Sequence, residues 1–218
     1  MKRLVALLML SVGACACACA QQPTVAELAK KVDAHYNHLH SLETRYAERY
    51  QGMGMDRTET GTLTLLKPGR MRWAYDSPPG KVFLLDGTNA ISYTPGDAEA
   101  TRFPEKKLDD LRSPLRFLLG HTELEKELQG LSVTLVSLNG QTAYTLWGTP
   151  VGMEQHVRSV AVTVDAQGVI HTLRVEETDG AITTFTFSEM HENVPVNEND
   201  FRFIPPAGVV VIEGANPV

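Results

Sequence analysis

The chain has 218 residues, a formal net charge of −6 at pH 7 and three cysteines, and 43% of its residues are hydrophobic. The acidic balance argues against a nucleic-acid-binding protein, because such proteins carry basic surfaces that neutralise phosphates. An acidic surface is also poorly attracted to anionic lipid headgroups, so we expect any contact with membranes to be specific rather than by adsorption.

The N-terminal residues predict a secretory signal peptide. Two basic residues precede an apolar run at residues 4–12, which is too short to span a bilayer. An Ala-Cys-Ala sequence at residues 18–20 fits the small-residue rule for cleavage before Gln21. We therefore expect residues 1–20 to be removed and the mature chain to lie in the periplasm.

Removal of this peptide would change both charge and cysteine content. The remaining 18 basic residues face 26 acidic ones, a balance of −8, and no cysteine is left for a thiol or a disulfide. The stability of the mature chain must then come from its core. About 200 residues suit one all-β unit, so we predict that residues 21–218 form a single domain.

Cys15 offers an alternative interpretation of the same segment. The sequence Val-Gly-Ala-Cys at residues 12–15 resembles a lipobox, at which bacterial lipoproteins are acylated on cysteine and cleaved. The small residues at 18–20 favour cleavage before Gln21, because glycine is tolerated but not preferred at the middle lipobox position. Lipid anchoring at Cys15 stays open as the alternative.

The first predicted elements are a helix and a strand. A capping-box pattern begins at Thr24, and apolar residues recur at helical spacing over residues 24–38. From residue 42 the apolar period changes to two, which predicts a strand with Tyr46 on its apolar face. The segment at residues 51–56, rich in Gly and Met, is typical of a turn.

Short strands separated by Pro-Gly, Asp-Gly and Asn-Gly turns follow along most of the chain. Their regular spacing, with no alternation of strands and helices, predicts a curved, meandering antiparallel sheet and a mainly β (α+β) fold. The expected strands cover residues 61–66, 71–75, 82–86, 90–93, 100–103, 131–138, 142–148, 157–165, 169–176 and 181–191.

A helical insertion is expected at residues 106–129. A Ser-Pro pair at residues 113–114 opens a segment that contains Phe117 and Leu118, and Thr122 is placed to cap a further turn over residues 123–128.

No motif of a known catalytic or cofactor site is present in the sequence. A Gly-x-Ser-x-Gly elbow, a phosphate-binding glycine loop, paired Cys-x-x-Cys sites and His-Glu-x-x-His are all missing, so we expect no enzyme, no catalytic residue and no cofactor. His35, His38 and His40 form the one potential metal cluster. Zinc sites usually draw ligands from more than one segment, so no metal site is predicted.

The strand after the Lys-Pro-Gly turn combines unusual residue types. Met71, Trp73 and Tyr75 alternate with Arg70 and Arg72, which places apolar groups on one face and guanidinium groups on the other. An ordinary half-buried strand explains the alternation. Methionine and the amphipathic aromatics are in addition suited to a surface that repacks around a ligand.

Three blocks of the sequence resemble the LolA family of lipoprotein carriers. Residues 61–93, GTLTLLKPGRMRWAYDSPPGKVFLLDGTNAISY, contain the family's G-x-L strand, its K-P-x-x-x-x-W turn and its D-G-x-x-x-x-x-Y hairpin. Residues 164–175, VDAQGVIHTLRV, resemble its V-x-x-x-G-x-I hairpin. Residues 200–214, DFRFIPPAGVVVIEG, resemble its closing F-x-F-x-P-P-x-G-V segment. With the Ser-Pro pair at 113–114, the similarity extends over essentially the whole mature chain.

The resemblance implies an unclosed β-barrel around a hydrophobic cavity, with helices as a lid. In the family this cavity holds the acyl chains of lipoproteins, which an inner-membrane ABC transporter, LolCDE, loads and an outer-membrane receptor, LolB, accepts where it is present. The implied protein is a monomeric periplasmic chaperone without covalent chemistry. In the best-known members an arginine before the proline latches the lid. Lys67 takes that position here, as a point donor rather than a planar fork.

The expected lipid-binding residues are apolar or aromatic positions of the strands and of the inserted helix, and Met71 and Trp73 fall on matching apolar positions of the family. Plain core packing is the alternative explanation for each. The set comprises Tyr46, Leu63, Leu65, Met71, Trp73, Phe83, Leu85, Ile91, Tyr93, Phe117 and Leu118.

Three other functions compete with a soluble carrier. A chain lipidated at Cys15 would be a membrane-anchored receptor resembling LolB. A periplasmic lipoprotein sensor resembling RseB would regulate a membrane partner, but such sensors carry an additional domain for which this chain has no room. An unrecognised enzyme would have to show turnover that copurified lipid cannot explain.

Overall fold

The computed structural model describes residues 22–104 and 123–214, and most of them lie in β-strands. The helices of this part are α1 (Val25–His38), the single turn α3 (Leu124–Glu127) and the 3₁₀ helix η2 (Glu198–Phe201). The strands are β1 (Ser41–Gly52), β2 (Met55–Leu66), β3 (Arg70–Tyr75), β4 (Val82–Asp86), β5 (Asn89–Tyr93), β6 (Glu99–Pro104), β7 (Leu128–Leu138), β8 (Gln141–Pro150), β9 (Val157–Val164), β10 (Ile170–Glu177), β11 (Ile182–Glu192) and β12 (Val210–Glu213).

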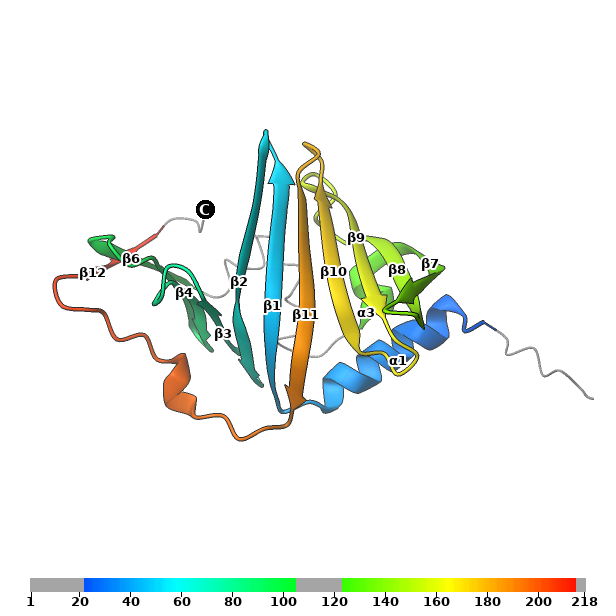
Figure 1. The fold of residues 1–218 in the computed structure, drawn as a ribbon, viewed down its shortest axis with the longest axis horizontal. Helices are drawn as coiled ribbons and strands as arrows, with labels where there is room; N and C mark the ends of the chain where they lie inside the picture. Colours follow the sequence, from blue (N-terminus) through cyan, green and yellow to red (C-terminus); the bar gives the residue numbers. More distant parts are fainter. Residues whose placement is uncertain (1–21, 105–122, 215–218) are drawn as a thin grey trace, which may run out of the picture.

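All twelve strands belong to one sheet, in the order β12-β6-β5-β4-β3-β2-β1-β11-β10-β9-β8-β7. Neighbours pair antiparallel, except that β12 runs parallel to β6. Strands β2, β1, β11 and β10 form the middle, and the outer strands curve away on either side as two wings (Figure 1). The two outer strands, β12 and β7, do not pair with each other, so the predicted curved and unclosed antiparallel sheet is confirmed.

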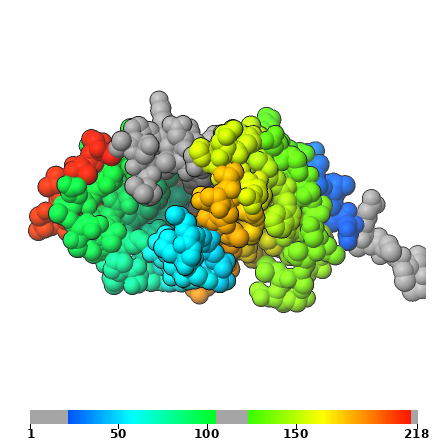
Figure 2. Space-filling view, turned by 90° about the horizontal axis from the view of Figure 1, so that it is seen from above, coloured from blue at the N-terminus to red at the C-terminus, as the bar shows by residue number. Residues whose placement is uncertain are grey.

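The upper end of the molecule is formed by hairpin tips. The β1–β2 tip, in cyan, lies beside the β10–β11 tip, in orange, and the surface is hollowed between the cyan tip and the green wing (Figure 2). We call the sheet face that carries the main apolar core the concave face, and the opposite face the convex face.

Helix α1 covers one end of the sheet (Figure 1). Thr24 caps the helix as the sequence predicts: its side chain accepts from the Glu27 amide, and the Glu27 carboxylate accepts from the Thr24 amide at 2.8 Å. Its apolar side, which includes Leu28, Val32 and Tyr36, is buried. The Tyr36 hydroxyl accepts from the backbone amide of Ile170 at 3.1 Å, which ties the helix to the β9–β10 hairpin. No helix among the described residues is long and apolar enough to cross a membrane.

Two predicted boundaries were wrong. Strand β2 begins at Met55, inside the expected turn, because residues 55–60 pair with β1 through the backbone although they lack an apolar alternation. The bidentate contact of Arg49 with Asp56, at 2.9 and 2.6 Å, supports this extension. The helical turn expected over residues 123–128 is only α3, because Leu128 already pairs with β8. The rest of the expected insertion lies outside the described residues.

The C-terminal segment was not predicted as an element of the sheet. From the end of β11 the chain runs to η2 and then to β12, which pairs along the edge of β6 (Figure 1). Phe201 of η2 is 1% exposed, and η2 packs against β3 and β4. Arg70 of β3 and Glu198 of η2 form an ion pair at 3.5 Å. We call residues 198–206 the strap.

Gly168, in the turn before β10, allows α1 to approach the sheet closely. Its φ is +90°, and a Cβ atom added there would lie 2.7 Å from the carbonyl carbon of Lys31 in the helix. Gly180 has a similar φ of +92°, but an added Cβ would meet nothing within 4 Å.

We expect Gly168→Ala to lower the free energy of unfolding by about 3 kcal/mol, because it adds overpacking against α1 to the cost of a positive φ. Gly180→Ala should cost about 1 kcal/mol, because only the backbone term applies. Urea denaturation of the two variants measures the difference. Equal losses of stability in the two variants would mean that α1 does not pack closely against the turn that contains Gly168.

Candidate functional site

The concave face of strands β2, β3 and β4 is built from two rows of apolar residues. Leu63 lies opposite Trp73 in the register of β2 and β3, and Trp73 lies opposite Phe83 of β4. The next row places Met71 between Leu65 and Leu85 in the same way. Directly opposed residues point to the same side of a sheet, so all six side chains lie on the concave face.

An aromatic cluster continues this surface onto β1 and β11. The rings of Tyr46 and Trp73 lie edge to face with centroids 4.5 Å apart, and Trp73 lies 5.4 Å from Phe185. Phe185 and Phe187 are parallel at 6.4 Å. The indole N–H of Trp73 donates to the sulfur of Met71 at 2.8 Å, so its one polar group is satisfied inside the cluster.

Gly61 makes room for the ring of Tyr46. The two residues are opposite each other in the register of β1 and β2. A Cβ atom at Gly61 would lie 2.6 Å from the Tyr46 hydroxyl and 2.2 Å from the carbonyl oxygen of Ala74. The glycine of the G-x-L strand is therefore required by the aromatic ring that covers it.

The hydroxyl of Tyr46 is a polar group in apolar surroundings. It is buried and has no hydrogen-bond partner among the described residues. Burial, with smaller contributions from Tyr75 and Glu48, raises the pKa of Tyr46 above its ordinary value. Because an unmade hydrogen bond is costly inside a protein, this hydroxyl is available to an acceptor on a ligand.

Toward the hairpin tips the concave face becomes polar. Glu48 of β1 lies opposite Glu59 of β2, and Glu59 forms an ion pair with Lys81. The Lys81 ammonium lies 4.1 Å from the centroid of the Tyr75 ring. Burial, and then the charge of Glu59, raise the pKa of Glu48. We call Glu48, Glu59, Lys81 and Tyr75 the polar rim.

Lys67 connects the end of β2 to helix α1. Its ammonium donates to the carbonyl oxygen of Tyr36, in the last turn of α1, at 2.6 Å. Its backbone amide donates to the carbonyl of His40 at 2.8 Å. Burial lowers the pKa of Lys67, as expected for an ammonium removed from water. The lysine predicted as a latch therefore contacts the helix that covers one end of the sheet.

Two of the expected site residues lie on the other face. Ile91 is opposite Leu84, and Tyr93 is opposite Val82, so both side chains point away from Met71 and Trp73. The alternation within residues 90–93 is compatible with either face, and only the register with β4 decides it. Phe117 and Leu118 lie outside the described residues. The structure brings together Tyr46, Leu63, Leu65, Met71, Trp73, Phe83 and Leu85.

The sequence analysis missed Phe185 and Phe187. Their spacing of two residues within the strand predicted at 181–191 indicates a shared face. Their position beside Tyr46 follows only from the pairing of β11 with β1, in which Phe187 lies opposite Tyr46.

The described residues contain no group of three or more His, Cys, Asp or Glu side chains placed to hold a metal ion. His35 Nε2 lies 2.9 Å from a carboxylate oxygen of Glu192, and His38 Nδ1 lies 2.5 Å from the carbonyl oxygen of Ala34. These two histidines therefore lie beside different groups.

Comparison with known proteins shows that the chain is similar to one family model and to several carrier proteins. The model of a family described as "Outer membrane lipoprotein carrier protein LolA" matches residues 46–204. The outer-membrane lipoprotein carrier protein of Nitrosospira multiformis is 28% identical over 157 residues, covering 71% of this chain and 72% of its own. That of Nitrosomonas europaea is 23% identical over 194 residues, covering 87% of this chain and 91% of its own.

A solved structure has the same fold. The crystal structure of a DUF1329 family protein from Desulfovibrio piger superposes with a TM-score of 0.51 at 15% sequence identity. The match covers 83% of this chain and 98% of that chain. At this identity the likeness concerns the fold alone.

Replacing Tyr46 tests whether its buried hydroxyl lacks a hydrogen bond. Tyr46→Phe removes a buried hydroxyl that has no hydrogen-bond partner in the described part of the chain, so we expect the free energy of unfolding to rise by about 1 kcal/mol. Tyr36→Phe removes a hydroxyl that accepts from Ile170, so it should lower that energy by about 1 kcal/mol. Urea denaturation measures both, and a loss of stability in Tyr46→Phe would contradict the description of this hydroxyl.

Proposed function

Because the chain belongs to the LolA family of outer membrane lipoprotein carrier proteins, we propose that it is a periplasmic chaperone that binds the acyl chains of lipoproteins and carries them from the inner to the outer membrane. The observation that carries this proposal is the concave face, where Met71, Trp73 and Phe185 form one apolar and aromatic surface at the inner side of an unclosed sheet.

The residue types of this surface suit acyl chains. Met71 is unbranched and polarizable, so it can repack around a flexible chain, and the rings of Trp73 and Phe185 offer broad apolar contact. Met71 is 2% exposed and Trp73 4% exposed. Entry of lipid therefore requires these side chains to be uncovered first.

The proposed lipid-contacting set follows the register of the sheet. It keeps seven of the residues expected from the sequence and adds Phe185 and Phe187, which lie in the same cluster. Ile91 and Tyr93 are left out because their side chains lie on the convex face. The proposed residues are Tyr46, Leu63, Leu65, Met71, Trp73, Phe83, Leu85, Phe185 and Phe187.

Polar groups around this surface would meet the head of the cargo. The Tyr46 hydroxyl can donate to an ester or amide carbonyl at the start of an acyl chain, because that hydroxyl has no other partner in the described part of the chain. The polar rim lies beyond it, toward the hairpin tips. The acyl chains would then lie against the apolar concave face, and the peptide part of the lipoprotein would leave past the polar rim.

The proposed role needs partners and no covalent chemistry. Loading would come from the inner-membrane LolCDE transporter, and unloading would go to the receptor LolB where that protein is present. The mature carrier would begin at Gln21 after removal of the signal peptide and act as a monomer. Its N-terminal mass would separate this form from one lipidated at Cys15.

The first test is release of lipoproteins from spheroplasts. Purified residues 21–218 should release outer-membrane lipoproteins into the medium as soluble one-to-one complexes. Met71→Glu should reduce release at least about tenfold, because a carboxylate at this position must be desolvated against the acyl chain. Phe83→Glu, at a half-buried position of the same surface, should act in the same direction with less cost to folding.

Thr64→Glu is the matched control, because Thr64 lies on β2 between Leu63 and Leu65 and points to the convex face. It should release lipoproteins like the unchanged protein. Equal release by all four folded proteins would remove the concave face from the site, and no release by any of them would contradict the carrier role.

Lys67 provides a second test. Lys67→Met keeps the length of the side chain but removes its bond to the Tyr36 carbonyl, so the end of α1 should open more often. We expect amide hydrogen exchange in the last turn of α1 to accelerate about tenfold, and bound lipid to leave faster. Lys67→Arg should restore both rates toward those of the unchanged protein. Unaltered exchange in Lys67→Met would show that this contact does not hold the helix.

A further inference from the structure

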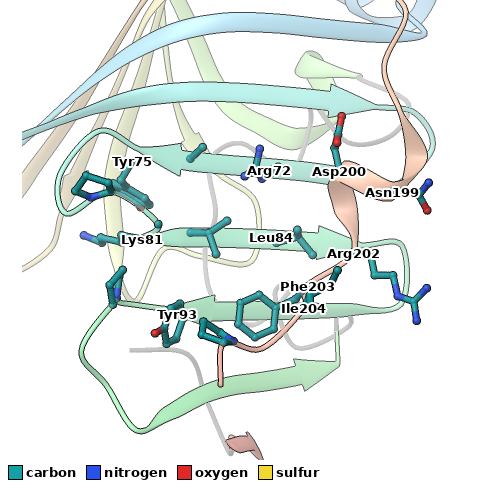
Figure 3. A pocket seen from close by; sticks show the side chains of 16 residues that line it. Arg72, Tyr75, Lys81, Leu84, Tyr93, Asn199, Asp200, Arg202, Phe203 and Ile204 are labelled. Carbon is teal, nitrogen blue, oxygen red and sulfur yellow. The ribbon is translucent and has the colours of Figure 1, made fainter. Parts of the chain in front are cut away.

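A pocket lies on the convex face, under the strap, and the proposed carrier role does not use it. Its volume is about 660 Å³, within the range of small-molecule sites. Arg72, Leu84 and Tyr93, from β3, β4 and β5, form its floor (Figure 3). Phe203 and Ile204 of the strap contribute to its wall.

The register separates this pocket from the concave surface. Arg72 lies opposite Leu84, and Leu84 lies opposite Ile91, so the floor is made by the side chains that alternate with Met71, Trp73 and Leu85. A ligand in this pocket would therefore be on the other side of the sheet from an acyl chain bound to the concave face.

The pocket floor carries one cation that pairs with no carboxylate among the described residues. Arg72 is half-buried and has no ion-pair or hydrogen-bond partner among the described residues, whereas Arg70, two residues earlier on the same face, pairs with Glu198. Lys81 lines the far end but is paired with Glu59. The guanidinium of Arg202 points away from the floor (Figure 3). Asp200 supplies the one carboxylate of the lining.

Most of the other lining residues are of apolar or aromatic type. The rings of Tyr93 and Phe203 lie 5.6 Å apart, and Leu84, Pro95 and Pro206 extend this surface. Ile204, which also lines the pocket, is 78% exposed.

We propose that this pocket binds a single-chain anionic amphiphile, with its carboxylate or phosphate on Arg72 and its chain between Leu84, Tyr93 and Phe203. A guanidinium can hold either anion through two parallel hydrogen bonds. Such a ligand would touch the sheet and the strap together, so its binding stabilises the attachment of residues 198–206.

The test is titration of residues 21–218 with dodecanoate and with lauroyl-lysophosphatidylglycerol, each below its micelle-forming concentration, by isothermal calorimetry. Backbone amide signals of Leu84, Tyr93 and Phe203 in NMR spectra report the convex pocket, and the indole signal of Trp73 reports the concave face. The tighter of the two probes identifies whether a fatty acid or a phospholipid is the source of the anion.

Arg72→Gln should weaken the binding that shifts the convex-face signals by about tenfold or more. Arg45→Gln is the matched control, because Arg45 of β1 lies on the same face of the sheet, and neither it nor its ion-pair partner Asp76 lines the pocket or belongs to the strap. It should leave the affinity unchanged. Dodecyltrimethylammonium, a cation with the same chain length, should bind at least tenfold more weakly than dodecanoate.

Three results would overturn the proposal. The first is that neither anionic probe shifts the signals of Leu84, Tyr93 and Phe203. The second is that Arg72→Gln loses no more affinity than Arg45→Gln. The third is that the cationic probe binds as well as dodecanoate. Binding that shifts only the Trp73 signal belongs to the concave face and likewise rejects a convex site.

Discussion

The architecture depends on one constraint: a wide sheet that curves without closing has an apolar inner face that must be kept from water. Strand alternation gathers Leu63, Met71 and Trp73 on that face. Helix α1 covers one end of the sheet. Its apolar side is buried there, and the Tyr36 hydroxyl and the Lys67 ammonium add hydrogen bonds between the helix and the strands. In the proposed carrier, access to the inner face would require the contacts of α1 to open while the strands stay paired.

This arrangement explains how a carrier could bind lipid without keeping it. At about 0.8 kcal/mol per buried methylene, one sixteen-carbon chain is held in a membrane by roughly 12 kcal/mol, so it cannot cross water without an escort. In the proposed carrier, acyl chains replace contacts that Met71, Trp73 and Phe185 already make with each other. The net gain is therefore smaller than the gross transfer energy, which favours delivery to a tighter acceptor.

Much of the fold could be predicted from the sequence, because turn residues and apolar alternation mark most strands, and Thr24 with Glu27 marks the start of α1. Residues 55–60 lack that alternation, so the first half of β2 is specified by its pairing with β1. For the site, Met71 and Trp73 follow from their neighbours in sequence. The face of Ile91 and the position of Phe187 depend on partners far along the chain, which no local pattern contains.

The central claim is that the concave face holds acyl chains. The most direct measurement is a crystal structure of residues 21–218 with a synthetic triacylated cysteinyl peptide. The account predicts acyl chains in contact with Met71, Trp73 and Phe185, with the peptide leaving past Glu48 and Lys81. Chains bound elsewhere, with the Trp73–Met71 hydrogen bond and the aromatic cluster unchanged, would contradict it.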